Sequence, residues 1–143
     1  MRGIEIDFVV SDSLEALKLY EQIFEVERIE VTNLPKGENE VVFSIHNMQF
    51  HMLDENKKFH LVAPKEDHPI TMWVNVTVPD IKDAYTKAIH AGCIEVQPVV
   101  VLTGYGVSNA SFIDPFGYHW MVHQIHEVVS HEERLKLWEN RKK

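Results

Sequence analysis

The chain begins with a regular alternation of apolar and polar residues. Side chains of a strand point alternately to its two faces, so residues 4–10 predict a strand whose apolar face is formed by Ile4, Ile6, Phe8 and Val10. Apolar residues then recur at helical spacing over 13–24, after the capping pair Asp12 and Glu15. Short strands are expected at about 27–34, 41–45 and 48–53, separated by turn residues.

The same order restarts after a polar stretch. Residues 70–78 alternate again, with one face formed by Met72, Val74, Val76 and Val78 and the other by Thr71, Trp73, Asn75 and Thr77. Asp80 and Asp83 predict a helix start and Gly92 its end, and strands follow near 94–102, 107–113 and 118–125. Ser130 and Glu133 form a capping box for a last helix, which offers Leu135 and Trp138 to pack on the body.

The two halves form an internal repeat at an offset of 68 residues. The offset pairs Val10 with Val78, Asp12 with Asp80 and Ala16 with Ala84, and the order of elements matches. We therefore predict an α+β fold of two βαβββ modules in one domain, 1–143. Its parts are a first module at 1–54, a linker at 55–69, a second module at 70–126 and a C-terminal helix at 130–142.

Composition narrows the classes of partner. The chain has 143 residues, 45% hydrophobic and 25% charged, which is typical of a globular domain that buries one core. Its net charge of −8 argues against nucleic acid and anionic membranes. Acidic residues in the first apolar run exclude a signal peptide, and the lone Cys93, interpreted as a structural thiol, favours the cytoplasm.

Several of these residues resemble a known superfamily. The strand ending in Val10-Ser11-Asp12, a helix bearing Ala16 and Tyr20, and the run Asp114-Pro115-Phe116-Gly117-Tyr118-His119-Trp120 are similar to the glyoxalase, bleomycin-resistance and extradiol-dioxygenase (vicinal oxygen chelate) superfamily. The DPFGxxW form and the acidic helix start at Ser130 resemble its PhnB-like branch. The Trp-Gly-Asp signature of that branch is absent, and residues 102–106 read Leu-Thr-Gly-Tyr-Gly instead.

The resemblance implies a curled mixed sheet with helices on one face and a cleft on the other. Apolar positions then belong to the helix side, including Met48, Phe50, Met52, Tyr118, Trp120 and Val122. The opposite positions face the cleft. They provide the predicted ligand-binding residues: Glu5, Asp7, His51, Trp73, Asn75, His119, Met121 and His123.

The resemblance also implies a position for a metal ion. Metal-using relatives take one ligand from each of four strands, and the matching positions here are Glu5, His51, Trp73 and Met121. Tryptophan cannot bind a metal and a thioether is a poor ligand for hard ions, so only two expected ligands remain. We therefore expect no metal cofactor. The alternative is a divalent metal held by Glu5 and His51 in a shifted site with Asp7, His119 or His123.

These residues have structural interpretations as well. Glu5 either bonds Asn75 or a nearby backbone group, or is desolvated beside Trp73 with a raised pKa, which makes it the candidate catalytic base. His51 is equally explained as a satisfied interior imidazole. Trp73 and Met121 either fill the cleft or provide a platform for an apolar ligand.

The leading prediction is a metal-independent protein that binds a small, partly apolar molecule, in sequestration or resistance. Its rival is a metal-dependent lyase, isomerase or dioxygenase with a rearranged ligand set. A third possibility is a dimer with a vestigial cleft. The resemblance implies a homodimer, because pairing between copies covers exposed sheet edges.

Overall fold

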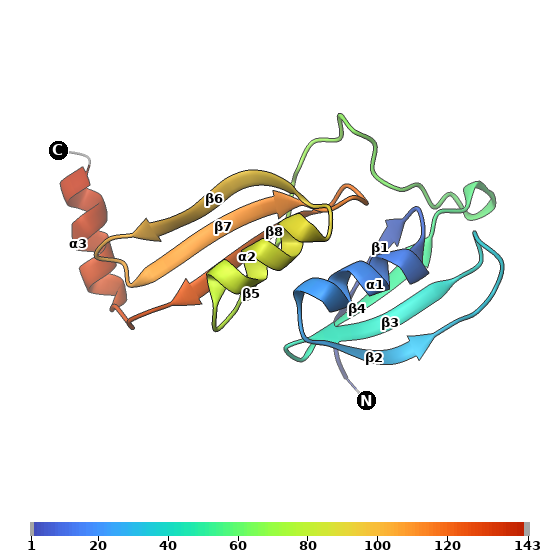
Figure 1. Ribbon diagram of the computed structural model, residues 1–143, viewed down its shortest axis with the longest axis horizontal. Helices are drawn as coiled ribbons and strands as arrows, with labels where there is room; N and C mark the ends of the chain where they lie inside the picture. Colours follow the sequence, from blue (N-terminus) through green and yellow to red (C-terminus); the bar gives the residue numbers. More distant parts are fainter. Residues whose placement is uncertain (1, 142–143) are drawn as a thin grey trace.

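The chain folds into two βαβββ modules in the predicted order, followed by one helix (Figure 1). The computed structural model describes residues 2–141, so Met1, Lys142 and Lys143, at the ends of the predicted domain and C-terminal helix, lie outside the described residues. Module 1 comprises β1 (Glu5–Val10), α1 (Ser13–Ile23), β2 (Val26–Val31), β3 (Glu40–Ile45) and β4 (Met48–Asp54). Module 2 comprises β5 (Val74–Thr77), α2 (Ile81–His90), β6 (Ile94–Leu102), β7 (Val107–Ile113) and β8 (His119–Ile125). The predicted α+β class is confirmed.

Each module has its own four-stranded mixed sheet. The strand orders are β1-β4-β3-β2 and β5-β8-β7-β6, with β1 parallel to β4, β5 parallel to β8, and the other neighbours antiparallel. Helices α1 and α2 contact each other, and each covers one face of its own sheet (Figure 1). Over the described residues the sheets remain separate rather than one shared sheet. The backbone carbonyl of Val9 in β1 accepts a hydrogen bond from the hydroxyl of Tyr118 at 2.7 Å. This partner from module 2 is a side chain and not a neighbouring strand.

The repeat gives both modules the same helix start. Asp12 accepts a hydrogen bond from the backbone N–H of Glu15, and Asp80 accepts one from that of Asp83, each at 3.1 Å. Gly92 follows α2 at φ +104°, a conformation that glycine adopts without strain. The predicted helix boundaries are therefore confirmed by the groups that satisfy the first and last turns.

The core lies between the helices and the sheets and joins the two modules. The ring of Trp120 lies 5.0 Å from that of Tyr20 and 5.3 Å from that of Phe24. Asp114, only 3% exposed, accepts hydrogen bonds from the Tyr20 hydroxyl at 2.6 Å and the Trp120 indole at 2.8 Å. Burial and the adjacent carboxylate raise the pKa of Tyr20 well above its usual value, so its hydroxyl remains a donor.

The predicted strand over 70–78 is too long. β5 begins at Val74, whose partner Trp120 is next to the start of β8, so the residues before it have no strand to pair with. Met72 is 63% exposed and Trp73 52% exposed, and Met72 is therefore not a core residue. Between the modules, the linker forms a short 3-10 turn, η1 (Lys57–Phe59), and an isolated bridge between Asn56 and Leu61.

Two other packing predictions are wrong. Met48 is exposed because it directly follows the turn between β3 and β4, whereas Tyr118, which lies before β8, is half-buried and packs against the core as predicted. The final helix, α3 (His131–Arg141), leaves Leu135 and Trp138 exposed. It extends beyond the sheet of module 2 (Figure 1), and its Leu137 is the side chain that approaches Gly104 in the β6–β7 turn.

None of the described helices is long and apolar enough to cross a membrane.

Candidate functional site

The face of β1 and β4 that is turned away from α1 carries a polar cluster. In β1 the more exposed Glu5 and Asp7 alternate with the apolar residues of the core side. Because β4 is the parallel neighbour, Asp7 pairs with His51 and Glu5 with Gln49. The alternation thus brings two of the predicted acids next to the predicted histidine.

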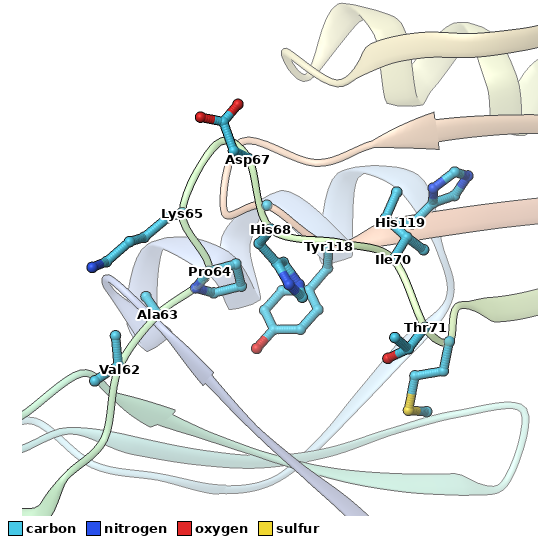
Figure 2. A pocket seen from close by; sticks show the side chains of 12 residues that line it. Val62, Ala63, Pro64, Lys65, Asp67, His68, Ile70, Thr71, Tyr118 and His119 are labelled. Atoms are coloured by element: carbon cyan, nitrogen blue, oxygen red, sulfur yellow. The ribbon is translucent and has the colours of Figure 1, made fainter.

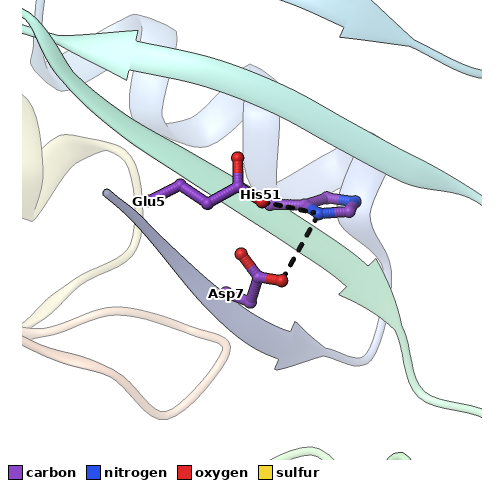
Figure 3. Close-up of side chains that lie close together, drawn as sticks. All are labelled: Glu5, Asp7 and His51. Atoms are coloured by element: carbon purple, nitrogen blue, oxygen red, sulfur yellow. Dashed lines mark ion pairs between the residues drawn. The ribbon is translucent and has the colours of Figure 1, made fainter. Parts of the chain in front are cut away.

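His51 is surrounded by three carboxylates. Its Nδ1 lies 3.4 Å from a Glu5 oxygen and 3.6 Å from an Asp7 oxygen (Figure 3), and its Nε2 lies 3.6 Å from a Glu40 oxygen. The other Glu5 oxygen accepts a hydrogen bond from the Gln49 amide at 2.5 Å. Protonation of this one imidazole would add a single positive charge, which is less than the combined negative charge of the three carboxylates.

The two acids of β1 have opposite pKa shifts. The hydrogen bond from Gln49 lowers the pKa of Glu5, and Asp7 acts in the same direction. Loss of solvation and then the adjacent Glu5 raise the pKa of Asp7. The hypothesis of a desolvated Glu5 with a raised pKa is therefore wrong, and its partner is Gln49 rather than Asn75. The alternation along β1 does not indicate that Gln49 of β4 lies beside Glu5.

The carboxylate and imidazole cluster has the spacing of a metal site. One ligand atom each from Glu5, Asp7 and His51 lies within 4.8 Å of the others. Ligands that share a tetrahedral zinc ion are roughly 3.3–3.5 Å apart, given bonds of about 2.0–2.2 Å. The two His51 distances approach this spacing, and three protein ligands are the usual number for a catalytic ion. Asp7 would provide one ligand in place of the two that Trp73 and Met121 cannot provide.

A cavity of about 350 Å³ lies between the modules, at the edges formed by β1 and β5. Three of the predicted ligand-binding residues line it: Asp7, Trp73 and His119. The rings of Trp73 and His119 are 6.1 Å apart, and His119 Nδ1 is buried without a hydrogen-bond partner among the described residues. The remaining lining residues are Ile6, Phe8, Val9, Phe50, Val62, Met72, Val74, Tyr118 and Trp120.

A second cavity, of about 570 Å³, adjoins the first under the linker (Figure 2). The linker and the residues that follow it up to Met72 form most of its wall, and the turn from Gly117 to His119 forms the rest. Both cavities are lined by Val62, Met72, Tyr118 and His119. The linker is therefore part of the wall of both.

The other predicted residues lie elsewhere on module 2. Asn75 and Met121 are partners in the β5–β8 ladder, and His123 Nδ1 is 2.5 Å from the Asn109 side-chain oxygen. These three residues do not line the cavity between the modules. The structure therefore forms two overlapping groups from the predicted set, Glu5, Asp7 and His51 on one side and Asp7, Trp73 and His119 on the other. Asp7 belongs to both.

Sequence reasoning missed most of the apolar wall. Phe8, Phe50 and Trp120 occupy strand positions on the helix side, and Phe50 and Trp120 are core residues as predicted, 1% and 2% exposed. All three also border the cavity at the sheet edges, which strand alternation alone does not indicate. Val62 lies in the linker, where an apolar residue within a polar stretch was an available signal.

Comparison with known proteins places the chain in a family. The family model of the Glyoxalase/Bleomycin resistance protein/Dioxygenase superfamily matches residues 4–122. No curated protein sequence matches the chain.

Solved structures of similar fold cover nearly the whole chain. A mutant of the fosfomycin resistance protein FosX from Listeria monocytogenes, complexed with Mn(II) and dihydroxypropylphosphonic acid, has 15% identity and a TM-score of 0.68 over 96% of this chain and 98% of its own. A glyoxalase/bleomycin resistance protein/dioxygenase family enzyme from Burkholderia phytofirmans has 14% identity and a TM-score of 0.66 over 85% and 96%. TioX from Micromonospora has 13% identity and a TM-score of 0.62 over 90% and 100%. The chain belongs to the Glyoxalase/Bleomycin resistance protein/Dioxygenase superfamily.

Proposed function

We propose that this protein binds a small, partly apolar organic molecule, without a metal ion, in the cavity between β1 and β5. The observation that carries the proposal is the composition of the wall. Aliphatic and aromatic side chains form most of it, and few polar groups, chiefly Asp7 and His119, face the space. Ligand sites commonly combine a largely apolar wall with a few polar groups that orient the ligand.

The size of the cavity supports a ligand with one or two rings. A volume of about 350 Å³ is at the small end of the range for ligand sites, roughly 300–1,000 Å³. Trp73 provides an aromatic surface at the rim, where half of its side chain is exposed. Binding of this kind suits sequestration or resistance, the role expected from the sequence.

Calorimetric titration with the neutral probe 2-naphthylmethanol tests the proposal. We expect one binding site per chain, weakened about tenfold by Trp73→Ala, because the ligand loses an apolar contact. Trp138→Ala is the matched control. The exposed fraction of Trp138, 48%, is similar to that of Trp73, but Trp138 lies on α3. Absence of binding, or equal weakening by both variants, would contradict a site between the modules.

A metal-dependent lyase, isomerase or dioxygenase is the second candidate function. The observation that favours it is the cluster of Glu5, Asp7 and His51, which fits a divalent ion in number and spacing. A bound ion would polarise an oxygen atom of the substrate. The protein would position that substrate against Trp73 and His119, since Asp7 joins the cluster to the cavity.

We further propose that the chain forms a homodimer and belongs to the PhnB-like branch. The outer strands β2 and β6 end their sheets and carry exposed aliphatic side chains, among them Ile29, Val96 and Val101. Pairing of such edges between copies would cover them. The DPFGxxW run supports the branch, and the buried, unpaired Cys93 supports the cytoplasm as location. Light scattering of the purified protein tests the dimer, and a monomeric mass would contradict it.

A further inference from the structure

Within residues 2–141, the cavity between the modules is lined by a negatively charged side chain and by no permanently positive one. Among its described lining residues, Asp7 is the only carboxylate, and the wall contains no lysine or arginine. His119 is the other ionisable side chain apart from the Tyr118 hydroxyl, which is donated to the Val9 carbonyl. A charged group that enters this cavity therefore meets a carboxylate and no permanent cation.

Asp7 is accessible to a ligand. Its side chain is 53% exposed, and its ion pair with His51 spans 3.6 Å, which is too long for a strong hydrogen bond. His51 is in addition shared with Glu5 and Glu40. Even a protonated His51 would leave this group of three carboxylates negative, so it does not neutralise Asp7.

The aromatic residues of the wall add to the attraction for a cation. Phe8 and Tyr118 lie against each other with ring centroids 4.9 Å apart, and Trp73 lies beside His119. The face of an aromatic ring attracts a cation, most strongly for tryptophan. Lys65 lines the adjoining cavity, and its side chain points away from Tyr118 (Figure 2).

We infer that the ligand of this cavity is an organic cation, an amine on an apolar or aromatic body, and that Asp7 selects it. The inference rests on the proposed function and narrows its ligand class. The amine lies at the Asp7 carboxylate, the apolar body contacts Phe8, Trp73 and Tyr118, and an aromatic carboxylate is excluded by charge repulsion. The net charge of −8 helps to draw cations toward the protein.

Three probes with the same ring system test the charge preference. They are 2-naphthylmethylamine, 2-naphthylmethanol and 2-naphthoate, titrated at mildly alkaline pH, where carboxylates are ionised and the amine is still protonated. We expect the amine to bind at least about fivefold more tightly than the alcohol, and the carboxylate more weakly than either. Added salt should weaken the binding of the amine only, because it screens the interaction between the amine and the carboxylate.

Two substitutions locate the preference. Asp7→Asn should abolish the preference, so that the ratio of the affinities for the amine and the alcohol falls to near one. Asp67→Asn is the matched control: it removes the same charge from a residue that lines only the adjoining cavity, and should leave the preference unchanged.

The outcomes separate the two proposals. Equal binding of amine and alcohol, tightest binding of the carboxylate, or a preference that persists in Asp7→Asn overturns the selection of a cation but leaves ligand binding intact. Failure of all three probes to bind contradicts the proposed function itself. The probe series and its salt dependence are measured on the unaltered chain, so the inference remains testable if Asp7→Asn does not fold.

Discussion

Tyr20 in α1 donates its hydroxyl to the carboxylate of Asp114, 94 positions later in the chain, at 2.6 Å. This buried contact links the first helix of one module to the turn before the last strand of the other. Asp114 also accepts the backbone N–H groups of Phe116 and Tyr118, so one carboxylate holds both the turn and the helix.

Removing the Tyr20 hydroxyl should destabilise the protein. We expect Tyr20→Phe to lower the free energy of unfolding by about 1–3 kcal/mol, because the buried carboxylate loses a donor. The matched control is Tyr85→Phe, whose hydroxyl bonds the exposed Glu95 and whose loss should change stability by less than about 0.5 kcal/mol. Urea unfolding measures both, and similar losses would show that burial of Asp114 is unimportant.

Asp54 should make stability depend on pH. Burial opposes its ionisation, but hydrogen bonds from Ser13, Gly37 and Asn39 outweigh burial and lower its pKa. A lowered pKa in the folded state contributes stability above the unfolded pKa, about 3.9, and this contribution disappears as the pH falls through the folded value.

We therefore expect Asp54→Asn to be less stable than the original protein at neutral pH by about 1–3 kcal/mol, with the difference shrinking in acid. Urea unfolding over a pH series measures this convergence. Asp67 is exposed, and the free energy of unfolding of Asp67→Asn should follow that of the original protein at every pH. A constant difference between Asp54→Asn and the original protein would refute the role of the charge.

Gly106 should tolerate alanine less well than Gly37 does. Both have positive φ, +71° and +98°, but a Cβ at Gly106 would lie 2.2 Å from the Glu127 carbonyl oxygen, whereas at Gly37 the nearest atom is 4.0 Å away. We expect a loss of about 1 kcal/mol for Gly37→Ala and roughly 3 kcal/mol or more for Gly106→Ala. Thermal unfolding measures both, and equal losses would mean that the backbone around Glu127 yields easily.

A chelator should not affect binding of 2-naphthylmethanol, because Asp7 is the only member of the metal-like cluster that lines the cavity. Calorimetry with and without the chelator measures this. The metal-dependent alternative instead requires stoichiometric binding of Mn²⁺ that is lost in His51→Ala. It should persist in His123→Ala, which alters a histidine of module 2 that is bonded to Asn109.

The fold followed from the sequence because alternation and capping are local properties. Ile6, Phe8 and Val10 share a face wherever the strand lies. Asp12 and Asp80 each cap a helix by accepting a hydrogen bond from the backbone N–H three residues later. Strand ends were less predictable. β5 begins at Val74 because its parallel partner β8 begins beside it, at His119, and this depends on tertiary structure.

The site was predictable only in part, for the same reason. Alternation correctly turned Glu5, Asp7 and His51 to one face. It could not show that Gln49 donates a hydrogen bond to Glu5, or that Phe8 and Trp120 also border a cavity between the modules. The prediction for the packing of α3 was wrong because nothing in its sequence indicates which part of the body the helix contacts. The side chain of Leu137 approaches Gly104 in the β6–β7 turn.

Asp7 belongs to both the His51 cluster and the cavity wall, so one carboxylate borders two neighbouring candidate sites. A divalent ion held at the cluster and an ammonium group in the cavity would compete for its oxygens. Each would then weaken the other by the same factor, since such linkage is reciprocal. Metal availability would thereby tune how readily the protein releases its organic cargo.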